Sequence, residues 1–217
     1  MNSFKNPEPV PPASQMAVLP FLSAVEGLLS ASPVENLRLT IHRVMNREGQ
    51  EFLQQVCSYL PLDKTAKPTA GRTFPVNEGI MGEAYGNQKI YRTGFQESDE
   101  ALQQALGEDK PNAKSWLAMP FLGRDDQVVL ILFGECNTLN YFADDARIEQ
   151  IAAMARGFCK LHDYLQASPF ANLRNFPLQK GNPNLEGGGV YDIQEPINVE
   201  PPKFSSLTSF NYEAAAA

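Results

Sequence analysis

The sequence predicts an α+β domain in which an antiparallel sheet has helices packed on it, with the first and last helices together on one face. Two observations support this class. Strand-like segments follow one another in pairs joined by short polar turns, as in antiparallel sheets. Two longer segments with apolar residues at three- and four-residue spacing stand before the first strand and after the last one. Amphipathic helices in these positions can bury their apolar stripes on the same side of a sheet.

Composition divides the 217-residue chain into three parts. Residues 1–15 are polar and rich in proline, which predicts a disordered or extended N-terminal arm. Residues 16–167 carry the regular apolar patterns of one domain. Residues 168–217 contain prolines and a run of three glycines, which predicts an extended tail. Large apolar residues are spaced through it, so the tail is expected either to wrap along its own domain or to dock on a partner protein; they are Phe170, Phe176, Tyr191, Ile193, Phe204, Phe210 and Tyr212.

The first half of the domain predicts a helix followed by a hairpin. The helix is expected over Met16–Ala31, with Pro20 in its first turn because proline disrupts a helix interior. Apolar and polar residues alternate from Leu37 to His42, which predicts a half-buried strand. A turn at Asn46–Gly49 then leads to a partner strand within Glu51–Leu60.

The second half adds a short strand, a helix, two long strands and a final helix. The short strand is Lys89–Thr93, and Ser98 is placed to cap the helix within Gln96–Leu106. Two strands follow at Ser115–Leu122 and Gln127–Gly134, and the second is apolar on both faces, as in a central strand. The last helix starts near Asp144–Asp145 and keeps an apolar stripe to about Gln166.

The stretch from Arg72 to Tyr85 is the most specific local pattern. An extended run ends at Gly79, and a helical turn that contains Gly82 follows before the strand Lys89–Thr93. Glycines at these positions let one backbone segment pass close to another. The pattern resembles the central signature of GAF domains, and the resemblance covers about residues 16–166. It implies a sensor-like fold with a ligand cleft beside this turn; a PAS-like sandwich is the alternative fold.

Charge and hydropathy exclude several classes of partner. The net charge of −7 disfavours binding to nucleic acid, because phosphates require a basic surface. No run of about 20 apolar residues stands in the sequence, so no membrane insertion is expected. From the polar N-terminus we expect no secretory signal, and the three cysteines, Cys57, Cys136 and Cys159, are widely spaced. We therefore expect free thiols and a cytoplasmic protein.

The sequence indicates no catalytic residue, no metal site and no cofactor. Neither histidine, His42 nor His162, has a partner at metal-ligand spacing, and we expect both at the surface or in a helix interface. No nucleophile, P-loop or dinucleotide motif occurs. We therefore predict that the chain is not an enzyme.

The GAF resemblance implies three specific activities that the sequence does not support. Free methionine-R-sulfoxide reductases resemble this fold and use cysteines around the pocket, but Met81 stands at one of those places. Cyclic-nucleotide-binding GAF domains carry an Asn-Lys pair after the last strand, which Cys136-Asn137-Thr138 does not match. Attachment of a bilin would need a cysteine in the loops lining the cleft.

A ligand pocket is expected between the sheet and the segment from Arg72 to Trp116. Arg92 could pair with an anionic group, and Trp116 could stack on a flat one. For each candidate a structural role is the alternative: core packing for Met81 and Trp116, a solvated edge charge for Arg92 and the start of a strand for Ser115. The full candidate set is Met81, Tyr85, Tyr91, Arg92, Ser115 and Trp116.

Two functions follow from these observations. The first is a non-catalytic GAF-like regulatory or sensory module for signalling, which binds a small molecule or a protein partner and forms a homodimer through the helices Met16–Ala31 and Asp144–Gln166. The second is a structural or adaptor subunit whose core is ligand-free and whose C-terminal tail docks on a partner protein. In both cases the last helix is expected to close the domain, so that removing residues 168–217 leaves the core folded.

Overall fold

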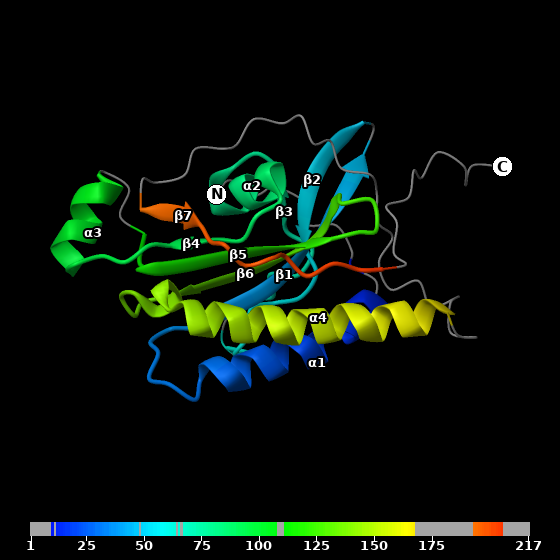
Figure 1. Cartoon of the computed structure of the whole chain (residues 1–217), viewed down its shortest axis with the longest axis horizontal. Helices are drawn as coiled ribbons and strands as arrows, with labels where there is room; N and C mark the ends of the chain where they lie inside the picture. Colours follow the sequence, from blue (N-terminus) through cyan, green and yellow to red (C-terminus); the bar gives the residue numbers. More distant parts are fainter. Residues whose placement is uncertain are drawn as a thin grey trace.

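The computed structural model describes residues 10, 12–47, 49–63, 65, 67–107, 111–167 and 193–205. Within them, seven strands form one antiparallel sheet in the order β3-β2-β1-β6-β5-β4-β7 (Figure 1). The expected α+β class and antiparallel sheet are confirmed. The strands are β1 (Arg38–Arg47), β2 (Gln50–Gln55), β3 (Thr73–Pro75), β4 (Tyr91–Thr93), β5 (Ser115–Leu122), β6 (Val128–Cys136) and β7 (Gln194–Pro196).

Helices cover both faces of this sheet. The first and last helices lie side by side on one face, as predicted, and α2 lies on the other (Figure 1). Ser98 caps α3 as expected, because its Oγ accepts a hydrogen bond from the Ala101 amide at 3.2 Å. The helices are α1 (Pro12–Leu29), α2 (Gly79–Asn87), α3 (Asp99–Leu106) and α4 (Asp145–Ala167), and a 3-10 turn, η1 (Tyr141–Ala143), precedes α4.

Helix α1 begins four residues before the expected start at Met16, so Pro20 lies in its interior rather than in its first turn. Pro12 opens the helix, where a missing amide costs no hydrogen bond. Pro20 is tolerated because it lies on the exposed face. The carbonyl of Met16, four residues earlier, loses its helical donor, and Met16 is itself exposed.

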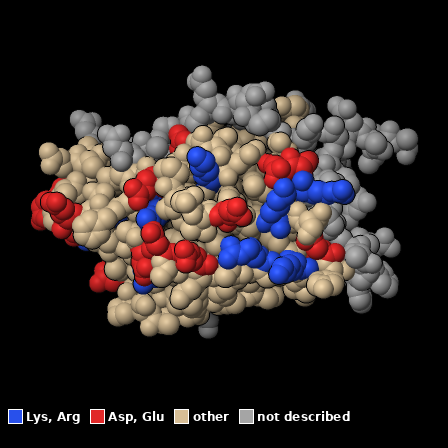
Figure 2. Space-filling view, viewed as in Figure 1, with Lys and Arg blue, Asp and Glu red and all other residues tan. Residues whose placement is uncertain are grey.

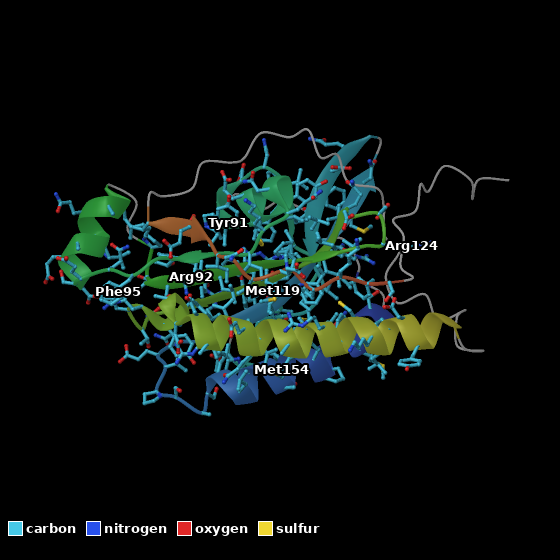
Figure 3. All side chains as sticks on the ribbon, viewed as in Figure 1. Tyr91, Arg92, Phe95, Met119, Arg124 and Met154 are labelled. Atoms are coloured by element: carbon cyan, nitrogen blue, oxygen red, sulfur yellow. The ribbon has the colours of Figure 1, made fainter. Side chains whose placement is uncertain are left out.

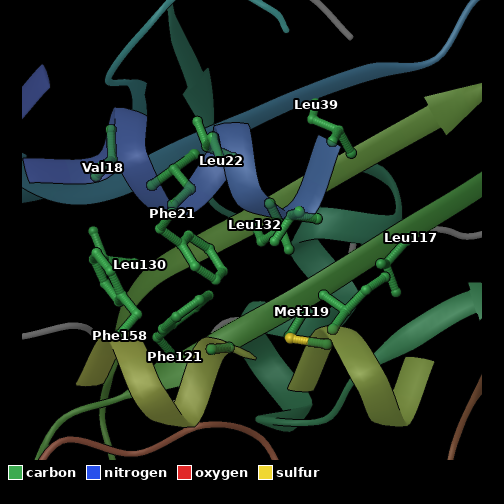
Figure 4. Close-up of a cluster of buried hydrophobic side chains, with 14 of the residues drawn as sticks. Val18, Phe21, Leu22, Leu39, Leu117, Met119, Phe121, Leu130, Leu132 and Phe158 are labelled. Atoms are coloured by element: carbon green, nitrogen blue, oxygen red, sulfur yellow. The ribbon is translucent and has the colours of Figure 1, made fainter. Parts of the chain in front are cut away.

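Two hydrophobic cores lie on opposite faces of the sheet. The core under α1 and α4 contains a cluster of aromatic rings: the centre of the Phe21 ring lies 5.9 Å from that of Phe121, edge-to-face, and 4.9 Å from that of Phe158 (Figure 4). The second core lies between the sheet and α2, with α3 at its margin. Central strands must therefore supply apolar side chains in both directions, which explains the continuous apolar run of β6.

This second core corrects the prediction of a half-buried strand at Leu37–His42. Because α2 covers the face that the sequence assigned to solvent, Thr40 and His42 of β1 are buried. Arg43, which points to the opposite face, is also buried. Thr40 satisfies its hydroxyl by donating to the Cys57 carbonyl at 2.9 Å. The Nε of Arg43 donates to the Gln54 side-chain oxygen at 2.8 Å.

Residues 193–205 of the tail pack on their own domain. β7 pairs antiparallel with β4, and further along the tail the Phe204 amide donates to the Leu122 carbonyl at 2.9 Å. The Phe204 side chain is fully buried in the core under α1 and α4, and Ile193 is buried in the other core. The other large apolar residues singled out in the tail lie outside the described residues. Where it is described, the tail therefore wraps along the domain.

Surface charge is mixed on the face in view in Figure 2, where acidic side chains crowd the end at which α3 lies and basic ones lie mostly toward the other end. Across the described ranges, helices that combine the length and the hydropathy of a membrane span do not occur.

Candidate functional site

A cavity of about 430 Å³ lies between the sheet and the first turn of α2. It opens where the sequence analysis expected a pocket. Its polar lining consists of Arg38, His42, Arg72, Glu135 and Gln194. Its aromatic lining consists of Tyr59, Phe74, Trp116 and Phe133. Residues 79–81 of α2 and Pro111 complete it.

Two glycines bring α2 to this position. Gly79 has a φ of 61°, a left-handed conformation that lets the chain turn sharply from β3 into the helix. At Gly82 a Cβ atom would lie 2.7 Å from the backbone carbon of Asn77, so only glycine allows the helix to approach this closely. Glu78, at the N-cap, makes no side-chain hydrogen bond to the first turn. The positive end of α2 therefore faces the cavity without a side-chain cap.

His42 is the most unusual residue of the cavity. The prediction of a surface or interface position is wrong, because the side chain is 1% exposed and lies in the middle of β1. Phe74 and Phe133 contact its ring edge-to-face, with centroids at 5.4 and 6.2 Å. Neither ring nitrogen has a hydrogen-bond partner among the described residues. Burial, and then the charge of Arg72, lowers the pKa of His42 to about 3, so the ring is neutral at pH 7.

The charges around the cavity leave one cation in excess. Arg38 pairs with Glu135 at 2.8 Å, and its guanidinium lies 4.0 Å from the centre of the Tyr59 ring. Burial raises the pKa of Glu135, while Arg38 and Arg72 act against this shift. Arg72 lies over the ring of Phe74 at 5.3 Å and has no ion-pair partner among the described residues. Arg38 and Glu135 compensate each other, so Arg72 supplies the uncompensated charge.

A second hollow of about 760 Å³ adjoins the cavity on the side of the loop after β2. Arg38 and Tyr59 line both spaces. The stacked pair of Arg38 and Tyr59 therefore borders both hollows.

The structure places two of the six predicted site residues, Met81 and Trp116, in the cavity lining. Tyr85 donates its hydroxyl hydrogen to Glu51 at 2.6 Å, and the Tyr91 hydroxyl accepts from the Asn87 amide at 3.0 Å. Both tyrosines therefore support α2 and β4 rather than line the cavity.

The other two predicted residues, Arg92 and Ser115, tie the 3-10 turn to the sheet. Arg92, next to Tyr91 on β4 (Figure 3), pairs with Asp145 at 2.6 Å and with Glu195 at 3.3 Å. It also donates to the carbonyl of Ala143 at 2.7 Å. The Ser115 hydroxyl accepts a hydrogen bond from the Phe142 amide at 3.0 Å.

Four cavity residues were not predicted from the sequence: His42, Tyr59, Arg72 and Gln194. Arg72 opens the GAF-like stretch and could have been included on that ground. His42 could have been recognised only by treating β1 as a central strand. Gln194 lies in the tail, far along the chain from the other lining residues, and no local sequence pattern distinguishes it.

The three cysteines lie away from the cavity lining and are buried and free. Burial raises the pKa of the Cys57 thiol, raises that of Cys136 to about 11 and raises that of Cys159 further. All three are therefore protonated at pH 7. Over the residues with described positions, clusters of three metal-binding side chains do not occur.

Comparison with known proteins finds similarity in structure only. No family model matches the sequence, and no curated protein matches it. The similar solved structures include fRMsr of Staphylococcus aureus in its reduced form, at 14% identity and a TM-score of 0.40, over 70% of this chain and 94% of that one. An IclR transcriptional regulator from Alicyclobacillus acidocaldarius matches at 14% identity and a TM-score of 0.38, over 67% of this chain and 64% of that one.

A third match is a structure described as that of the GAF domain, at 12% identity and a TM-score of 0.39, over 65% of this chain and 86% of that one. All three share a GAF-like fold.

One of these matches corrects the prediction that the chain is not an enzyme. fRMsr is a methionine sulfoxide reductase, so an enzyme is among the proteins that share the fold. The fold class gives no ground for excluding enzymatic activity, and we withdraw that prediction.

Proposed function

We propose that this chain is a regulatory or sensing module that binds a small molecule in the cavity between α2 and the sheet. The observation that carries the proposal is His42, a fully buried imidazole in the cavity wall whose two nitrogens have no partner among the described residues. A buried polar atom without a partner costs about 1–3 kcal/mol. A ligand that hydrogen-bonds to His42 recovers this cost, whereas a purely structural residue at this position would be apolar.

The tail offers a route by which binding is transmitted. Gln194 of β7 lines the same cavity, and its side-chain oxygen is buried without a partner among the described residues. A ligand that contacts both His42 and Gln194 stabilises the docked tail strand relative to a detached one. Ligand binding thereby shifts the population of the two tail states, which a partner protein can detect.

Mass spectrometry of the protein purified from its own host tests the proposal. Under native conditions we expect the folded chain to carry a stoichiometric small mass, which denaturation releases. The His42→Phe variant, purified in the same way, should carry much less of it. Equal retention by the variant, or no small mass on the wild-type chain, would contradict the proposal.

Two finer proposals concern assembly. A homodimer through α1 and α4 would use helices that already share one face, and the exposed apolar residues Met16, Leu161 and Tyr164 lie on them. Sedimentation at increasing concentration measures this directly. Docking of the tail on a partner protein, the adaptor alternative, concerns residues 168–192 and 206–217, which lie outside the described residues.

A further inference from the structure

Charge, hydrogen-bonding groups and wall shape each restrict the molecule that the cavity can bind, and together they define a chemical class. This inference rests on the proposed function, because it names the ligand of the same site.

The charge balance selects an anion. Arg72 is the uncompensated cation of the lining, and the Arg38–Glu135 pair is neutral as a unit. The first turn of α2 adds the positive end of a helix that has no side-chain cap. A single negative charge balances Arg72. A second one would lie beside the Glu135 carboxylate without a matching cation, which is costly.

His42 selects a group that both accepts and donates hydrogen bonds, or a ligand with two polar groups. A neutral imidazole presents one N–H donor and one acceptor nitrogen. Its side chain projects from the floor of the cavity between Phe74 and Phe133. A carboxylate oxygen on the ligand can accept a hydrogen bond from the imidazole N–H. A hydroxyl or ring N–H on the ligand can donate one to the other imidazole nitrogen.

The aromatic walls select a flat body. Four aromatic side chains line the cavity, from three strands and from the loop after β2. Flat rings gain from stacked or edge-to-face contacts with such walls, about 0.5–1.5 kcal/mol per pair beyond the area buried. A volume of about 430 Å³ is at the small end of the range for ligand pockets.

We propose that the ligand is a flat aromatic or heteroaromatic monocarboxylate. Its carboxylate lies against Arg72 and the first turn of α2, and its ring lies among Phe74, Trp116 and Phe133 within reach of His42.

Trp116 makes the test specific to this cavity, because it is the only tryptophan in the chain. Protein labelled with 5-fluorotryptophan has one ¹⁹F resonance, and titration with a probe measures binding at that position. Three probes separate the requirement for a negative charge from the requirement for a flat ring. The probe 2-naphthoate is flat and anionic, 2-naphthamide is flat and neutral, and decalin-2-carboxylate is anionic and not flat. We expect 2-naphthoate to bind at least tenfold more tightly than either of the others.

The variant Arg72→Gln should weaken binding of 2-naphthoate at least tenfold and leave binding of 2-naphthamide unchanged. Arg124→Gln is the matched control, because Arg124 is exposed in the turn between β5 and β6, away from the lining residues (Figure 3). It should change neither affinity.

Each outcome decides the ligand class. Equal affinity for the amide, or for the decalin acid, overturns the proposed class while the cavity remains a binding site. A ¹⁹F resonance that no probe shifts also overturns the class. The proposed function fails on a different result, the absence of any released small mass in the purification experiment.

Discussion

At the scale of single residues, His42 combines a cost in stability with its proposed role in binding a ligand. Its ring is surrounded by aromatic side chains that offer no hydrogen bond, so the folded protein loses the hydration of both nitrogens. Such sites are where residues selected for function rather than stability are expected. Replacing the imidazole should therefore increase stability and weaken ligand binding.

We expect His42→Phe to raise the free energy of unfolding of the ligand-free protein by about 1 kcal/mol, because the substitution removes two buried polar atoms and keeps a flat ring. Urea denaturation at pH 7.5 measures the change. His162→Phe is the matched control: His162 is also buried but has a hydrogen-bonding partner in the backbone of Ala17, so its replacement should bring no gain. A loss of stability in His42→Phe would show that the imidazole is satisfied within the folded protein.

The two histidines also predict how stability depends on pH. Burial lowers the pKa of His42 to about 3 and that of His162 to about 4, whereas the unfolded chain binds these protons near pH 6.5. The unfolded state therefore holds more protons below pH 6.5, and stability falls as the pH decreases, down to each folded-state pKa. Linkage gives about 2 kcal/mol lost per histidine between pH 7.5 and 5.

Urea denaturation at pH 7.5, 6 and 5 tests this dependence. The His42→Phe chain should lose about 2 kcal/mol less than the wild type over that range. Parallel pH curves for the two proteins would mean that His42 is protonated in the folded state.

At the scale of elements, α2 positions the cavity through one glycine. Gly82 allows the helix to pack closely against the backbone of Asn77, and the sequence pattern indicated such a close approach. This packing places the start of the helix at the edge of the cavity. The close approach is a property of the helix and the preceding loop together.

Gly82→Ala should destabilise the fold by about 1–3 kcal/mol, because its Cβ would lie 2.7 Å from a backbone atom that cannot rotate away. Gly157→Ala, in α4 with nothing within 4 Å of the added carbon, should instead stabilise by up to about 1 kcal/mol. Thermal denaturation followed by circular dichroism compares the two. A neutral Gly82→Ala would mean that the start of α2 can move away from the loop at Asn77.

At the scale of the whole molecule, the described tail segment belongs to the cores. It adds strand β7 at the sheet edge, brings Phe204 beneath α4 and gives Gln194 to the cavity. From the sequence, the core was predicted to stay folded when residues 168–217 are removed. These contacts lead to the opposite expectation, since the removal takes away a strand and buried side chains from both cores.

Phe204→Ala tests the contribution of the tail without shortening the chain. Truncating this fully buried ring should cost about 3–5 kcal/mol. Phe95→Ala is the control, because Phe95 is 73% exposed and its loss should change stability by less than about 0.5 kcal/mol. Denaturant unfolding of both variants makes the comparison, and equal effects would show that the tail segment is detached in solution.

Local patterns were sufficient to predict the helices and strands from α1 to α4, their order and the capping of α3 by Ser98, but not the strand β7 in the tail. They also located the glycine turn that forms one side of the cavity. Each of these features depends on residues close together in the chain, where periodicity, capping and glycine geometry act.

Only the tertiary structure decided which side chains meet at the cavity. His42 was predicted to face solvent because it is a polar residue in an alternating strand. Alternation shows that the two faces of a strand differ, but it does not show what covers each face. Gln194 reaches the site through pairing of β7 with β4, about one hundred residues earlier in the chain. Such contacts arise from the packing of distant segments, where burial and the competition for unpaired strand edges determine the outcome.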